Sequence, residues 1–122
     1  MIHIGIDLHI SNVVNSAIND NGHELWSGKI AATEAGLGDF FAQFDQPVQA
    51  VVESTGNWYW VADWCAAHNI PLKLAHAKML KAISYAKVKT DTVDARTLAE
   101  LLRVGLIPEA HMQMGTQRDL RG

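Results

Sequence analysis

The sequence predicts an α/β domain in which a five-stranded mixed sheet carries helices on both faces. Short runs rich in β-branched residues come first, and in the second half of the chain similar runs alternate with stretches of helical periodicity. The 122 residues, 48% of them apolar, suffice for one domain with a core of its own. We therefore expect an antiparallel meander followed by strands that are connected through helices.

Three strands are expected in the first 30 residues. Residues 1–8 form an apolar run, and residues 12–18 form a second, valine-rich run. Asn19-Asp20-Asn21-Gly22 is a strong signal for a tight turn, which returns the chain as a third strand over residues 23–30. This pattern is typical of an antiparallel meander.

Helices and strands then alternate. A helix opens at Thr33-Glu34-Ala35 and stops before Pro47, and residues 48–53 form the fourth strand. A tryptophan-rich helix follows over residues 57–68, and residues 72–75 form the fifth strand.

The last expected elements are two helices, over residues 78–85 and 91–105. We assign residues 1–105 to one domain and residues 106–122 to a tail of weak structure. A right-handed crossover from the first strand to the fourth lays these two strands parallel and adjacent. The order β-β-β-α-β-α-β-α, with the second of these two helices after it, is the ribonuclease-H-like arrangement.

Four acidic residues are the strongest functional signal. Asp7 closes the first strand and Glu53 closes the fourth, so both carboxylates should emerge at the same edge of the sheet. Asp91 and Asp94 lie three apart at the head of a helical stretch, a spacing that places their Cβ atoms roughly 5–6 Å apart. Converging carboxylates repel one another, and such clusters persist where divalent cations bind them. Paired Mg²⁺ ions on oxygen ligands serve phosphoryl transfer.

The charge distribution adds a second signal. The net charge is −3, yet residues 73–122 hold nine basic side chains against five acidic ones. A basic band next to a carboxylate cluster suits a phosphodiester that lies across a metal site. The candidate contacts to nucleic acid are Lys78, Lys81, Lys87, Lys89 and Arg96. The alternative is a set of basic side chains that merely solvate a helix face.

Composition also bears on the compartment. The single cysteine, Cys65, excludes an internal disulfide and fits a reducing environment. No apolar stretch approaches the ~18 residues that span a bilayer, and the first residues do not form an export signal. We expect a cytoplasmic protein without a membrane partner.

Three motifs carry a resemblance to a known family. They are Gly5-Ile6-Asp7-Leu8-His9, Glu53-Ser54-Thr55-Gly56 and Lys89-Thr90-Asp91-Thr92-Val93-Asp94-Ala95. The chain resembles the N-terminal half of the DEDD-type insertion-sequence transposases, relatives of the pilin gene invertase that include recombinases guided by a bridge RNA. The likeness extends from Met1 to Ala110, and the Lys-Thr-Asp-x-x-Asp-Ala block is its most specific part.

The resemblance implies a RuvC-like catalytic domain that breaks and joins DNA strands during transposition. Its four acids, Asp7, Glu53, Asp91 and Asp94, would be both catalytic and metal-binding, with Mg²⁺ as cofactor and Mn²⁺ as a substitute. DNA, a guide RNA and further copies of the chain would be its partners. Family members continue into a helical segment and a second domain with a serine nucleophile, so we expect residues 1–122 alone to be inactive in recombination.

Several alternatives stay open. Asp91 and Asp94 could simply cap a helix. The domain could be a non-catalytic module for nucleic-acid binding or oligomerisation, or a Holliday-junction-type nuclease; an actin-like or sugar-kinase ATPase would need a glycine-rich turn after Asp7 that is absent here. Among the aromatic residues, Trp60 and Trp64 are expected in the core and Trp58 nearest to substrate. Ser54 is interpreted as a residue next to a turn rather than as a nucleophile.

Overall fold

The computed structural model describes residues 1–84 and 94–111. Within these residues the chain forms five strands and four helices, in the order β1 (Ile2–Leu8), β2 (Asn12–Ile18), β3 (Glu24–Ala31), α1 (Glu34–Ala42), β4 (Val48–Glu53), α2 (Tyr59–Ala67), β5 (Leu72–Ala75), α3 (Ala77–Ser84) and α4 (Ala95–Arg103). The predicted α/β class and the order of elements are confirmed.

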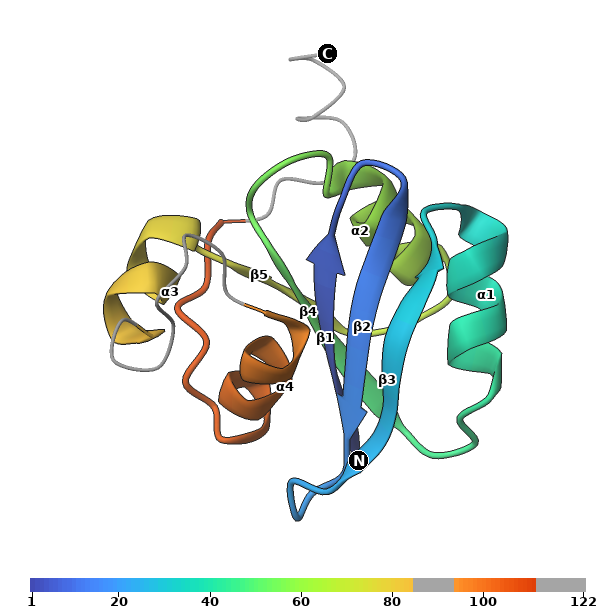
Figure 1. Cartoon of the computed structure of the whole chain (residues 1–122), viewed down its shortest axis with the longest axis horizontal. Helices are drawn as coiled ribbons and strands as arrows, with labels where there is room; N and C mark the ends of the chain where they lie inside the picture. The colour runs from blue at the N-terminus through green and yellow to red at the C-terminus, as the bar shows by residue number, and fades with distance from the viewer. Residues whose placement is uncertain (85–93, 112–122) are drawn as a thin grey trace.

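The five strands form one mixed sheet in the order β3-β2-β1-β4-β5 (Figure 1). β1 is antiparallel to β2 and parallel to β4, and β4 is parallel to β5. This is the ribonuclease-H-like topology that the sequence predicts, with β1 and β4 adjacent at the centre.

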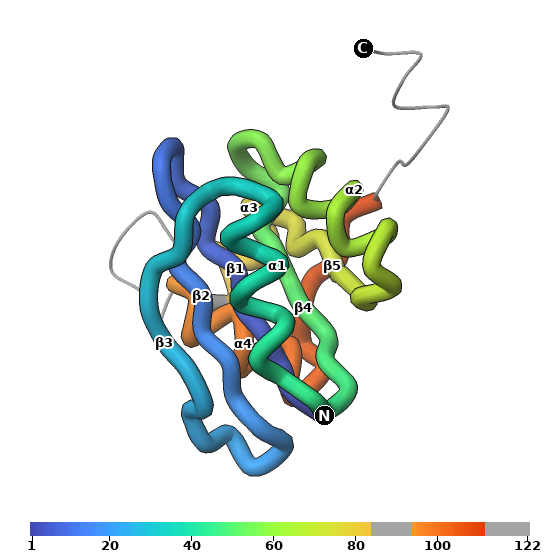
Figure 2. The backbone as a smooth tube through the Cα atoms, turned by 90° about the vertical axis from the view of Figure 1, so that its right-hand side faces the viewer, coloured from blue at the N-terminus to red at the C-terminus, as the bar shows by residue number. Residues whose placement is uncertain are grey.

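Helices cover both faces of the sheet. α1 and α2 lie on one side, in front of the strands in Figure 2, and α3 and α4 lie on the other (Figures 1 and 2). The larger core cluster joins the first face to α1 and α2 and includes Ile4, Ile6, Leu37, Phe40, Val61 and Trp64. The smaller cluster fills the second face and consists of Val51, Ala75, Leu80, Leu98 and Leu102.

The central strand alternates between these two layers. Ile4 and Ile6 are fully buried against α1 and α2, whereas Gly5 faces α4. A Cβ atom at Gly5 would clash with the carbonyl oxygen of Ala95 and lie 2.8 Å from the backbone nitrogen of Ala99. The backbone of α4 therefore rests directly on β1, and only glycine leaves room for it.

The last helix begins later than the sequence predicts. Asp94 has extended backbone dihedrals and is the N-cap of α4, so the helix starts at Ala95 rather than at Asp91. The predicted residues 91–93 fall outside the described part of the chain, as does Tyr85 at the end of the preceding predicted helix. An aspartate side chain is favoured at the N-cap because it accepts a hydrogen bond from a first-turn backbone N–H group that has no partner within the helix.

Part of the predicted tail is ordered against the sheet edge. The backbone N–H of His76 donates to the carbonyl of Pro108 at 2.6 Å, and that of Ala110 donates to the carbonyl of Leu74 at 2.8 Å. An isolated antiparallel bridge joins Ala75 to Glu109. Residues 108–110 thus cover the open edge of β5, and residues 112–122 lie outside the described chain.

The contact at Gly5 gives a test of this architecture. Gly5→Ala should destabilise the fold by at least about 2 kcal/mol in urea unfolding, because the atoms it meets belong to backbone that cannot rotate away. Gly38→Ala is the matched control: its Cβ would lie 3.8 Å from the ring of Trp64, so it should stabilise α1 by about 0.5–1 kcal/mol. Equal effects at the two positions would contradict the close packing of α4 on β1.

Candidate metal centre and nucleic-acid interface

Asp7 and Glu53 lie side by side at the ends of two parallel strands. Ile6 of β1 pairs with Val52 of β4, and the two acids are the next residues along each strand. Gly5 and Val51, two residues earlier, also pair and face α3 and α4. Because side chains alternate along a strand, both carboxylates emerge on this same face.

Burial raises the pKa values of both carboxylates. Burial raises the pKa of Glu53, and the charge of Asp7 raises it further. Burial likewise raises the pKa of Asp7, whose side chain is 18% exposed. The Nε2–H of His9 donates to Oδ2 of Asp7 at 3.2 Å, and this contact partly offsets the effect of burial on the Asp7 pKa.

Asp94 is the N-cap of α4 and also interacts electrostatically with Asp7. Its Oδ1 accepts a hydrogen bond from the backbone N–H of Thr97 at 2.8 Å. Its charge also raises the pKa of Asp7. The structure therefore confirms the capping interpretation of Asp94, and the metal-binding interpretation stays a prediction. Asp91, the fourth predicted acid, lies outside the described residues.

One predicted basic residue acts electrostatically on Glu53. The ammonium group of Lys81, on α3, lowers the pKa of Glu53 and so opposes the effect of burial there. Ser54 helps to place this helix, because its hydroxyl oxygen accepts from the backbone N–H of Ala77 at 3.2 Å. Ser54 thus links the end of β4 to the start of α3. Lys78 is exposed on the same helix, and Lys87 and Lys89 lie outside the described residues.

Arg96 contacts a different part of the molecule. Its guanidinium donates to the carbonyl of Gly22 at 3.0 Å and lies 3.4 Å from Glu24 and 3.6 Å from Glu100. These contacts tie α4 to the β2–β3 turn. The structure therefore gives Arg96 intramolecular partners, and its contact to nucleic acid stays a prediction.

The described residues offer few side chains that could bind a metal ion together. Within residues 1–84 and 94–111, no three histidine, cysteine, aspartate or glutamate side chains form a group that could hold a metal. The pair formed by Asp7 and Glu53 nevertheless suits Mg²⁺, which keeps several waters and needs only one or two protein carboxylates. The charge of Asp7 raises the pKa of Glu53, and a cation bound between the two carboxylates would offset this repulsion.

Comparison with known families settles the class of the chain. The family model DEDD_Tnp_IS110, described as "Transposase", matches residues 4–122. The chain belongs to this family. No curated protein matches the chain. Family membership makes DNA the general partner of this transposase chain, and none of the helices in its described residues could cross a membrane.

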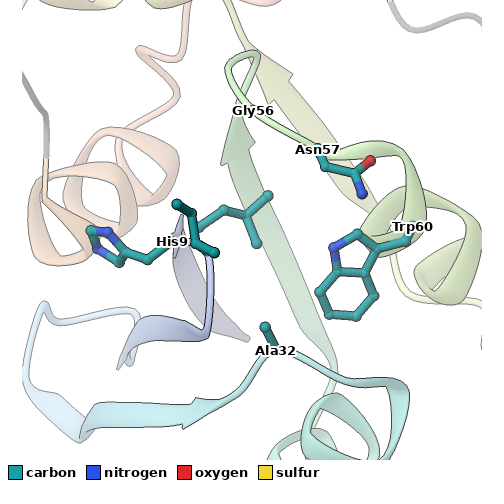
Figure 3. A pocket seen from close by; sticks show the side chains of 7 residues that line it. His9, Ala32, Gly56, Asn57 and Trp60 are labelled. Atoms are coloured by element: carbon teal, nitrogen blue, oxygen red, sulfur yellow. The ribbon is translucent and has the colours of Figure 1, made fainter.

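The aromatic residues of the transposase chain are placed differently from the prediction. Trp58, expected nearest to substrate, is buried and stacks on Tyr59 with ring centroids 4.0 Å apart. Trp64 is in the core, as predicted. Trp60, expected in the core, is partly buried against the core cluster and also lines a cavity at the end of β1 together with Asn57 (Figure 3). A one-residue offset on a helix turns a side chain by about 100°, which a tryptophan-rich segment does not reveal in its sequence.

The raised pKa of Asp7 predicts how stability varies with pH in the absence of divalent cations. Its folded-state pKa lies above the unfolded value, so the fold favours the protonated form, and this stabilisation is lost as the pH rises through the folded-state pKa. Asp7→Asn should therefore be more stable than the wild type at pH 7 and similar to it near about pH 4, in urea unfolding with EDTA.

Asp20 provides a control of opposite sign. Hydrogen bonds from His3 and from the terminal amine lower the Asp20 pKa, so its contribution is present at neutral pH and is lost as the pH falls through its folded-state pKa. Asp20→Asn should lower stability at pH 7. If the free energy of unfolding varied with pH in the same way for the wild type and Asp7→Asn, the Asp7 carboxylate would not destabilise the fold.

Proposed function

We propose that this chain is the RuvC-like catalytic half of a DNA transposase or site-specific recombinase. Asp7, Glu53, Asp91 and Asp94 would hold Mg²⁺, with Mn²⁺ as a substitute, for breaking and joining DNA strands. The observation that carries the proposal is the placement of Asp7 and Glu53 on adjacent parallel strand ends, where burial raises both pKa values. The charge of Asp7 raises the Glu53 pKa further, and the charge of Asp94 raises the Asp7 pKa. Membership of the transposase family supports the same chemistry.

The residues around these acids have distinct roles in the proposal. Bound Mg²⁺ would stabilise charge on the phosphoryl oxygens and lower the pKa of the attacking group. His9 holds the orientation of the Asp7 carboxylate through its hydrogen bond. The Thr97 N–H bonded to Oδ1 of Asp94 fixes that side chain at the start of α4, near Asp7.

Lysines next to the acids would steer nucleic acid to this edge. Lys81 is electrostatically coupled to Glu53, and Lys78 is exposed one turn earlier on α3. Lys87 and Lys89 remain in the proposal on their sequence position alone. Arg96 stays a proposed contact to nucleic acid, and its guanidinium also ties α4 to the β2–β3 turn. A DNA strand, a guide RNA and further copies of the chain are the proposed partners.

Residues 1–105 would be the catalytic domain, with residues 106–122 leading toward a helical region. The resemblance to the family assigns a serine nucleophile to a second domain. We therefore expect residues 1–122 alone not to exchange strands, whereas weak metal-dependent nicking is compatible with the proposal. A cytoplasmic location likewise stays a prediction.

A non-catalytic nucleic-acid-binding module is the second candidate. The capping role of Asp94 favours it, because a capping aspartate is accounted for without any metal. The raised pKa values of Asp7 and Glu53 argue against it. Two buried carboxylates destabilise the fold at neutral pH, and a module without a cation for them would have nothing to offset this effect.

Metal binding separates these candidates. Mg²⁺ at ten times its dissociation constant should stabilise the wild type by about 1.4 kcal/mol, measured as a rise in Tm. Asp7→Asn and Glu53→Gln should each abolish this increment while retaining the fold. Glu109→Gln is the matched control, because Glu109 is an exposed acid that pairs with Lys73 at the sheet edge. An increment that survives in both site variants would eliminate the shared metal site.

Salt dependence tests the lysines. In a Lys78→Gln, Lys81→Gln double variant, the slope of log affinity for duplex DNA against log salt should fall by about 0.9 for each lysine that contacts a phosphate. Lys73→Gln should keep the wild-type slope, because Lys73 is paired with Glu109 at 3.6 Å. Slopes that do not differ between the double variant and the wild type would return these lysines to a merely solvating role.

A further inference from the structure

A cavity of about 670 Å³ opens at the same end of β1, on the α1/α2 side. Three connections form it: β1 to β2, β3 to α1, and β4 to α2. Its lining consists of Leu8, His9, Ile10, Ala32, Gly56, Asn57 and Trp60. This volume is in the range of about 300–1,000 Å³ that is typical of small-ligand sites.

The walls of the cavity suit a flat apolar group. The indole of Trp60 extends from α2 into the cavity, and Ala32 lies below it in Figure 3. Leu8 and Ile10 add aliphatic surface, and Ile10 is fully exposed at the cavity rim. Exposed aliphatic and aromatic side chains that converge on one hollow favour a ligand with a planar apolar face.

The polar groups of the cavity suit a neutral ligand that forms hydrogen bonds. Asn57 is exposed and offers an amide with both donor and acceptor atoms. Gly56, with φ of +64°, has open space where a Cβ would stand. Among the residues that the structure describes, no lysine, arginine, aspartate or glutamate lines the cavity. The cavity therefore suits a nucleobase edge better than a phosphate or a carboxylate.

His9 connects the cavity to the carboxylates. It lines the cavity, yet its imidazole turns away from Trp60 in Figure 3 and lies 3.2 Å from Oδ2 of Asp7. The acids and the cavity thus flank the end of β1 on opposite sides. A nucleotide has the same polarity, with a charged phosphate at one end and a flat base at the other.

We propose that this cavity takes one unpaired nucleobase of the nucleic acid whose phosphate lies at Asp7 and Glu53. Trp60 stacks on the base and Asn57 bonds its edge. The base is unpaired because one inside a duplex presents neither its face nor its pairing edge. This inference rests on the proposed function and adds a base-specific contact to it.

The experiment uses two short duplexes with the 122-residue chain in Mg²⁺. One carries a single extrahelical thymine, and the other has an abasic residue at that position. Wild type should bind the thymine duplex roughly tenfold more tightly, the value of one stacked base. Trp60→Ala should bind both duplexes equally, and Trp60→Phe should recover most of the preference. Asn57→Ala should weaken the preference without affecting the fold, because Asn57 is exposed.

Other outcomes would overturn the inference. A wild type without preference for the thymine duplex would show that no base enters the cavity, as would a preference that survives in both Trp60→Ala and Asn57→Ala. A Trp60→Ala variant with unchanged DNA binding but a smaller sedimentation coefficient would assign the cavity to a second copy of the chain. The Mg²⁺ increment in Tm is measured on the same samples. If the thymine preference is missing but Mg²⁺ still raises the Tm, the proposed metal site stands and the base pocket fails. If the thymine preference and the rise in Tm are both missing, both proposals fail.

Discussion

The close approach of α4 to β1 at Gly5 is the constraint on which the candidate site depends. The backbone atoms of Ala95 and Ala99 occupy the space that any larger residue at position 5 would need. This contact seats the first turn of α4 over the central strand, so its N-cap, Asp94, comes into electrostatic range of Asp7. It also lets Leu98 and Leu102 complete the smaller core cluster with Val51 of β4. The absence of a side chain at Gly5 thus allows Asp94 to lie close enough to Asp7 to raise its pKa.

The candidate site residues and the cavity lie at the edge of the sheet where β1 and β4 end. Parallel neighbours deliver Asp7 and Glu53 to the same edge and the same face, and α3 adds Lys81 beside them. The connection that follows Glu53 serves both faces. Its Ser54 accepts a hydrogen bond from the first turn of α3, and its Asn57 lines the cavity on the α1/α2 side. Ligand sites are typically found beyond the carboxyl ends of strands in such sheets, because the connecting loops converge there.

Prediction from sequence worked best where a residue's role follows from its own strand. Asp7 and Glu53 end runs of β-branched residues, so their pairing required only the crossover rule that lays β1 beside β4. The roles of Asp94, Arg96 and Trp60 were less accessible. An aspartate before a helix fits a cap and a metal ligand equally well, and Arg96 reaches the distant Gly22 and Glu24. Trp58 is buried and Trp60 lines the cavity while packing against the core, in a helix that begins at Tyr59, two residues later than predicted.

The sequence by itself determined the class of fold, the order of the strands, the pairing of Asp7 with Glu53 and the transposase resemblance. These depend on local periodicity, turn signals and the fixed hand of crossovers, all of which are written along the chain. The tertiary structure alone decided the packing of α4 on Gly5, the docking of residues 108–110 on β5 and the cavity beside His9. Each of these joins segments that are far apart in sequence. Their contacts follow from complementary shape in three dimensions, which no local pattern encodes.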